Sequence, residues 1–223
     1  MAQLEAYLLD AYQTILHTDF GPYAEELPRL AGVPREILFS AWTQVAPLVT
    51  VGKITVPQAY ADVLEMAGIV PRPELERELA DKARELLLKA GQLYDDVLPF
   101  LRQARADGIK LAVVSNCDEN TRDLLAELGI TPLVDALALS CEVHAAKPSP
   151  EIYRAALDEL GVRPEAALFV DDNARFCAGA VELGIAAVRI ARDRELPPVP
   201  GLTTIRSLTE IGPLLARLAA GGS

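Results

Sequence analysis

Side chains suited to chemistry stand at four separate points of this 223-residue chain, each beside an apolar run. They are Asp10, Ser115 with Asn116, Lys147, and Asp171 with Asp172. Carboxylates act as nucleophiles and bind divalent cations, hydroxyl and amide groups stabilise an oxyanion, and an ammonium group neutralises negative charge. If the fold brings the four points together, this set of groups is suited to a nucleophilic displacement.

The apolar runs beside these residues are short, which is typical of buried strands. We expect strands at residues 4–9, 111–114, 137–139, 167–170 and 186–190, with helical stretches between them. That alternation predicts an α/β fold with a doubly wound parallel sheet, a Rossmann-like core. In open sheets of this kind ligands bind outside the carboxyl ends of the strands, where Asp10, Ser115 and Asp171 stand.

About 80 residues with helical periodicity and no strand-like run separate the first two strands. Within them, residues 74–90 alternate charged positions with Leu and Ala, which is typical of a helix with one packed face. We therefore expect an inserted α-helical cap domain at residues 17–91. The core domain would consist of residues 1–16 and 92–223.

Two helix starts carry a recognisable pattern. Ser149 precedes Pro150, which predicts that the Ser149 hydroxyl caps the helix that follows. Ser207 and Glu210 have the spacing of a capping box, in which each side chain accepts a hydrogen bond from a free amide at the start of the terminal helix.

Composition and charge limit the class of partner. The formal charge is −11 and no Lys/Arg-rich run offsets it, so we expect a small-molecule substrate and no nucleic acid. The first residues lack the pattern of a signal peptide, and no apolar run approaches the roughly 20 residues that span a bilayer. We expect a cytoplasmic protein with no membrane partner. Cys117, Cys141 and Cys177 are widely spaced, which predicts reduced thiols instead of disulfides or a zinc site.

Taken together, the four points resemble the motifs of the haloacid dehalogenase-like (HAD) hydrolase superfamily along essentially the whole chain. The first motif, an Asp followed at the fourth position by Thr, is matched by Asp10-Ala11-Tyr12-Gln13-Thr14. The second, a Ser or Thr at a strand end, is matched by Ser115. The third, a Lys before Pro-x-Pro and a helix, is matched by Lys147-Pro148-Ser149-Pro150, and the fourth, paired acids after an apolar strand, by Asp171-Asp172. An insert between the first two motifs implies the helical-cap subclass.

The resemblance implies a hydrolase in which Asp10 forms a covalent aspartyl intermediate. The residues implied to be catalytic are Asp10, Tyr12, Thr14, Ser115 and Lys147. Those implied to bind the substrate are Ser115, Asn116 and Lys147. The implied cofactor is Mg²⁺, held by Asp10, the main-chain carbonyl of Tyr12, Asp171 and Asp172. The implied reaction is hydrolysis of the phosphate ester of a small metabolite.

Two residues depart from the superfamily's phosphatases. Their general acid/base is a second Asp two positions after the nucleophile, whereas this chain has Tyr12. A positioned proton donor contributes about 10²- to 10⁴-fold, so we do not expect efficient hydrolysis of esters with poor leaving groups. Gln13 replaces the usual Gly, which predicts backbone strain if that position requires a positive φ.

Two alternative functions stay open. Tyr12 and Tyr153 resemble the 2-haloacid dehalogenase branch, whose leaving halide needs no proton. Against this, residues 39–44 lack that branch's substrate-binding Arg, and Asp171-Asp172 replaces its metal-free Ser-Ser motif. The other alternative is a catalytically weakened HAD-fold binding protein. Since adjacent carboxylates need a counter-charge, Mg²⁺-dependent phosphate-ester hydrolysis is the function we expect. No motif indicates the oligomeric state or the identity of the substrate.

Overall fold

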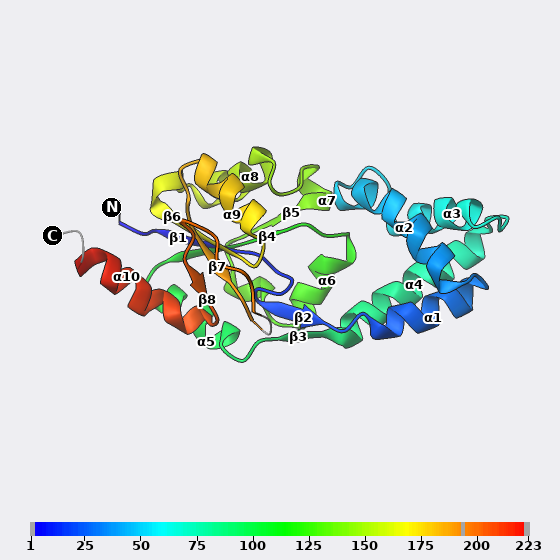
Figure 1. Ribbon diagram of the computed structural model, residues 1–223, viewed down its shortest axis with the longest axis horizontal. Coiled ribbons are helices and arrows are strands. Elements are labelled where there is room, and N and C mark those ends of the chain that lie inside the picture. Colours follow the sequence, from blue (N-terminus) through cyan, green and yellow to red (C-terminus); the bar gives the residue numbers. More distant parts are fainter. Residues whose placement is uncertain (1–2, 193–194, 221–223) are drawn as a thin grey trace.

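A six-stranded parallel sheet forms the centre of the protein, as seen in a computed structural model that describes residues 3–192 and 195–220 (Figure 1). The strands are β1 (Ala6–Leu9), β4 (Lys110–Ser115), β5 (Ala136–Leu139), β6 (Ala167–Asp171), β7 (Ala186–Ile190) and β8 (Thr204–Ile205). Their spatial order is β5-β4-β1-β6-β7-β8. The predicted doubly wound α/β core is confirmed, and each predicted strand is present. The sequence analysis missed β8, because two residues at a sheet edge leave no apolar run.

Helices cover both faces of this sheet. Helices α5 (Val97–Ala106), α6 (Asn120–Glu127) and α10 (Ile211–Ala220) pack on one face, and α8 (Pro150–Leu160) and α9 (Ala174–Glu182) on the other. In β1 the side chains of Tyr7 and Leu9 join the first core cluster, while Ala6 and Leu8 join the second. Both faces of β1 are therefore buried, which explains its continuous apolar sequence.

The predicted helical insert consists of four helices with a hydrophobic cluster of their own (Figure 1). They are α1 (Gly21–Ala31), α2 (Arg35–Thr50), α3 (Val56–Met66) and α4 (Pro73–Ala90). The expectation that this interval holds no strand was wrong at its ends, because β2 (Leu16–Thr18) pairs antiparallel with β3 (Gly91–Leu93). The predicted boundaries at residues 17 and 91 fall inside this strand pair. The division into two domains stays a prediction.

The two predicted helix caps differ in outcome. Ser207 and Glu210 form the expected capping box, at a short 3₁₀ turn (Leu208–Glu210) that leads into α10. Ser149 occupies the expected position before α8, but its hydroxyl donates to the Glu151 carboxylate and caps no backbone amide. That prediction was wrong, because a nearby carboxylate competes with the backbone for the hydroxyl. Further 3₁₀ turns span Thr131–Leu133 and Pro164–Ala166.

Two expectations from composition can be compared with the fold. Cys117, Cys141 and Cys177 are buried free thiols, as expected. Among the described residues, none of the helices combines the length and the apolar content that a bilayer-crossing helix needs.

The insert also touches the core through the loop between α2 and α3. This loop lies against α7 (Ser140–Val143), where the Ser140 hydroxyl donates to the carbonyl of Thr50 at 2.6 Å. Gly52 has φ +64°, and a Cβ atom there would lie 1.9 Å from the carbonyl oxygen of Cys141. Only glycine allows this approach, so Gly52 determines how closely the insert seats on the core.

We predict that Gly52→Ala separates the α2–α3 loop from α7. Gly68→Ala is the matched control, because Gly68 also has a positive φ, +76°, but no atom lies within 4 Å of the added Cβ. The control should lose about 1 kcal/mol of unfolding free energy from backbone strain alone. Gly52→Ala should lose at least about 1 kcal/mol more, because it adds a steric clash. Hydrogen exchange should rise at residues 50–56 and 140–144 in Gly52→Ala only. Equal losses and equal exchange in both variants would contradict the proposed seating role.

Candidate active site

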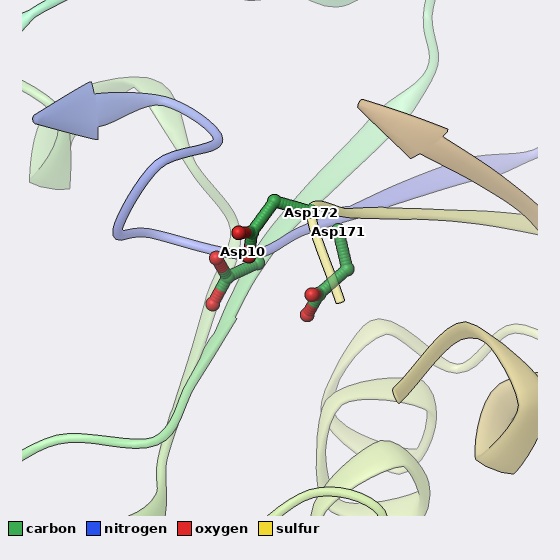
Figure 2. Close-up of side chains that lie close together, drawn as sticks. All are labelled: Asp10, Asp171 and Asp172. Carbon is green, nitrogen blue, oxygen red and sulfur yellow. The ribbon is translucent and has the colours of Figure 1, made fainter. Parts of the chain in front are cut away.

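Acidic side chains from two neighbouring strands converge at the carboxyl edge of the sheet. β1 lies between β4 and β6, with Leu9 opposite Val113 on one side and Val170 on the other. Asp10 follows β1, and its amide donates to the carbonyl of Val170 at 2.9 Å. Asp171 ends β6 and Asp172 follows it. One carboxylate oxygen from each of the three Asp residues lies within 4.8 Å of the others (Figure 2).

Lys147 joins this cluster from the loop before α8. Its Nζ atom donates to Asp10 Oδ1 at 2.5 Å and to Asp171 Oδ2 at 2.7 Å. The side chain is almost completely buried, and the ammonium group lies 5.5 Å from the centre of the Phe169 ring and 5.2 Å from that of Phe176. The aromatic faces and carboxylates compensate the cation for its lost hydration.

Asn116 holds the backbone of Lys147 in place. Its Nδ2 atom donates to the Lys147 carbonyl at 3.0 Å, and its Oδ1 atom accepts from the Lys147 amide at 2.7 Å. Both ends of the amide are thus engaged with the Lys147 backbone. The predicted direct contact between Asn116 and a substrate stays a prediction.

Burial and the neighbouring charges shift the pKa values of the side chains in the cluster. Burial, followed by the charge of Asp10, raises the pKa of Asp171 to about 7, although Lys147 acts in the opposite direction. Burial alone would lower the pKa of Lys147, but the two carboxylates outweigh it and raise that pKa. The three Asp side chains together offer only oxygen atoms as ligands, and this donor set fits a hard divalent cation such as Mg²⁺.

Two hydroxyl groups of the site lack a partner. Thr14 Oγ1 and Ser115 Oγ are buried, and neither has a hydrogen-bond partner among the described residues. A buried hydroxyl without a partner costs about 1–3 kcal/mol. Both belong to predicted catalytic residues, Ser115 at the end of β4 and Thr14 in the loop between β1 and β2. Their donation to an oxyanion of a bound molecule stays a prediction.

The environment of Tyr12 does not suit an acid/base role. Its hydroxyl shares a hydrogen bond of 2.9 Å with Thr121 Oγ1 on α6, and burial raises its pKa. A phenol with a raised pKa does not ionise near neutral pH and exchanges protons poorly as a general acid or base. The predicted coordination of a metal by the Tyr12 carbonyl stays a prediction.

An arginine brace supports the loop that follows Asp10, and the sequence analysis missed it. Arg192 donates from Nε and Nη2 to the Thr14 carbonyl, at 2.9 and 2.7 Å. It pairs with Asp96 at 2.7 Å and lies 4.4 Å above the ring of Tyr94. Asp96 also accepts from the Ser207 hydroxyl at 2.6 Å. These residues are far apart in the chain and share no motif, so no local signal could have found them.

Comparisons with known proteins agree on one family. A model of that family, described as haloacid dehalogenase-like hydrolase, matches residues 4–184. A phosphatase of Mycobacterium tuberculosis is 28% identical over 95% of this chain and 97% of its own length. An (S)-2-haloacid dehalogenase of a Pseudomonas species, strain CBS-3, is 31% identical over 98% of this chain and 99% of its own length. The crystal structure of an HAD phosphatase from Thermococcus onnurineus superposes with a TM-score of 0.70 and 25% identity, covering 95% of this chain and 98% of that one.

The expected strain at Gln13 is present, since this residue has φ +61°. We predict that Gln13→Gly stabilises the protein by about 0.5–1 kcal/mol. The left-handed conformation costs an L-residue about 1–2 kcal/mol, and Gly avoids this cost. Gly also loses more conformational entropy on folding, so the net gain in stability is smaller than the cost avoided. Gln13→Ala is the control, because it removes the side-chain contacts and keeps the Cβ atom. Denaturant unfolding of both variants provides the measurement. A Gly variant no more stable than the Ala variant would show that the loop tolerates its conformation without strain.

Proposed function

The chain belongs to the haloacid dehalogenase-like hydrolase family, and from this premise we propose that it hydrolyses phosphate monoesters of small molecules with the help of Mg²⁺. Family membership makes the protein a hydrolase. Both phosphatases and dehalogenases stand among its relatives, so the choice between them rests on the site itself.

The carboxylates around the nucleophile are the observation that supports the phosphatase. Asp171 and Asp172 each place one carboxylate oxygen within 4.8 Å of a carboxylate oxygen of Asp10. Halide displacement from a 2-haloacid brings in an anionic substrate and does not call for a second and third carboxylate beside the nucleophile. An all-oxygen set of this kind fits a divalent cation, which would attract a phosphate dianion.

In the proposed mechanism, Asp10 attacks phosphorus through a carboxylate oxygen. The new oxygen–phosphorus bond forms while the bond to the alcohol oxygen breaks. The electron pair leaves on that oxygen, which takes a proton from water, and an aspartyl phosphate remains. Lys147 orients Asp10 and neutralises charge, and the Thr14 and Ser115 hydroxyls donate to the phosphoryl oxygens. Mg²⁺, when bound by the three Asp residues and the Tyr12 carbonyl, would neutralise charge on the phosphoryl group. Water then attacks phosphorus, which releases phosphate and regenerates Asp10.

The dehalogenase alternative retains one structural argument. A Tyr at position 12 suits a leaving halide, since no proton has to be supplied. Tyr153, the second point of resemblance, has its hydroxyl occupied, because it donates to the Phe176 carbonyl at 2.8 Å. Helix α2, which holds the segment compared with the dehalogenase arginine, contributes Leu38, Phe39 and Trp42 to the nearby cavity. A weakened binding protein remains the other alternative, and loss of turnover on removal of the nucleophile separates it from an enzyme.

We predict Mg²⁺-dependent release of phosphate from an activated aryl phosphate, and no release of halide from 2-chloropropionate. Asp10→Asn should lower phosphatase turnover by at least about 10³-fold with little change in stability, because the amide cannot form the aspartyl intermediate. Asp158→Asn makes the same change at an exposed position of α8 and should retain full activity. Turnover that survives Asp10→Asn would refute the assigned nucleophile. Halide release without a metal would contradict the phosphatase proposal and support the dehalogenase alternative.

A second prediction concerns the missing proton donor. Tyr12→Asp should raise turnover of an alkyl phosphate relative to an aryl phosphate by at least about tenfold, because only the poor leaving group needs a proton from the enzyme. Tyr12→Phe removes the hydrogen bond to Thr121 without adding an acid and should leave that ratio unchanged. Parallel measurements of kcat/KM on the two esters give the ratio. An equal change for both esters in Tyr12→Asp would mean that another group already donates the proton.

A further inference from the structure

A cavity of about 480 Å³ lies between the four-helix insert and the core, beside the loop that follows Asp10. Its volume is that of a site for a small organic molecule. On the core side it is lined by Tyr12 and Gln13 of the nucleophile loop and by Asn116, which holds Lys147. A molecule whose phosphate reaches Asp10 would therefore extend its other half into this cavity.

Six of the sixteen residues that line the cavity are aromatic. They are Tyr12, Phe20, Tyr23, Phe39, Trp42 and Tyr60. Several pack against one another, with ring centres 5.4 Å apart for Phe20 and Tyr23 and 5.1 Å apart for Trp42 and Tyr60. Aromatic faces and edges bind a flat apolar group by burying its area and by stacking. They offer few hydrogen bonds to a sugar or another polyol.

The charge of the lining argues against ligands that carry a second anionic group. None of the described residues that line the cavity is basic, and its one charged group is the carboxylate of Asp118. Asp118 Oδ1 accepts a hydrogen bond from the Asn120 amide at 2.9 Å, which fixes the carboxylate at the start of α6. A second anionic group on a ligand would find no cation there and would be repelled by Asp118.

We propose that the alcohol half of the substrate is an apolar aromatic group that carries no negative charge apart from the phosphate. This inference rests on the phosphatase function proposed above and names its substrate class. An aryl phosphate also suits a site whose Tyr12 donates no proton. When Asp10 bonds to phosphorus, the bond to the phenolic oxygen breaks and its electron pair leaves on that oxygen. The aromatic ring stabilises the phenolate, which takes its proton from water.

Trp42 allows occupancy of the cavity to be measured directly. It is the only tryptophan of the chain, and it lines this cavity. Its fluorescence, excited at the red edge of its absorption where phenols do not absorb, therefore reports ligands in the cavity whether or not they are hydrolysed.

The first experiment compares 4-ethylphenyl phosphate with 3-(4-phosphooxyphenyl)propanoate. Two methylene groups insulate the carboxylate from the ring, so the two phenols are nearly equal as leaving groups. At about pH 8 Asp118 is ionised, since burial raises its pKa only to about 6. We expect kcat/KM for the uncharged ester to exceed that for the carboxylate ester by at least about tenfold. Equal values, or a preference for the carboxylate ester, would overturn the proposal.

The second experiment measures binding of the two phenols alone, 4-ethylphenol and 3-(4-hydroxyphenyl)propanoate, through the fluorescence of Trp42. The uncharged phenol should bind at least about tenfold more tightly. Asp118→Asn keeps the oxygen that accepts from Asn120 but removes the charge, so it should reduce this preference severalfold. Asp158→Asn, on the exposed side of α8, should leave it unchanged.

A preference that is absent, or that Asp118→Asn and Asp158→Asn change equally, would overturn the assigned class. If neither ester is hydrolysed with Mg²⁺ while the phenols bind in the expected order, the phosphatase function fails and the ligand class stands.

Discussion

Much of this structure follows from the need to bury several charges of the same sign at one point. Asp10 and Asp171 have almost no exposure to solvent, and in a medium of low dielectric their repulsion is large. Lys147 lies between them, and it is held there by two aromatic rings and by the Asn116 amide. The order of the strands is what makes this possible, because β1 has β4 on one side and β6 on the other. Each polar residue comes from the end of a different strand or from a loop, so the local backbone of one does not restrict the position of the next.

The sequence predicted the parts of this arrangement that depend on local pattern. The strands, the helical stretch between the first two of them, and the convergence of Asp10, Lys147 and Asp171 all follow from apolar runs and from the polar residues that stand next to them. What it did not predict depends on contacts between distant segments or on very short elements. β2, β3 and β8 have only two or three residues each, too few for a period to be visible. The Ser149 hydroxyl had two partners within reach, and the sequence does not say which of them it takes.

The cavity beside the site shows a second limit of sequence reasoning. Its aromatic residues come from α1 and the residue before it, from α2 and α3, and from the nucleophile loop, and each of them alone fits a packing role. Trp42, for example, packs on Tyr60 and also lines the cavity. Only the relative placement of insert and core brings these side chains around one space. Under the proposed function, specificity depends on how the insert meets the core, whereas the reaction depends on four short motifs.

The arginine brace extends the reaction machinery beyond the segment that the family shares. The family model ends at residue 184, while Arg192 and Ser207 lie after it and hold the Thr14 carbonyl through hydrogen bonds and Asp96. The loop that follows Asp10 is thus held in part by residues beyond the segment that the family model matches. A change at Arg192 would therefore reach this loop without altering any of the four motifs.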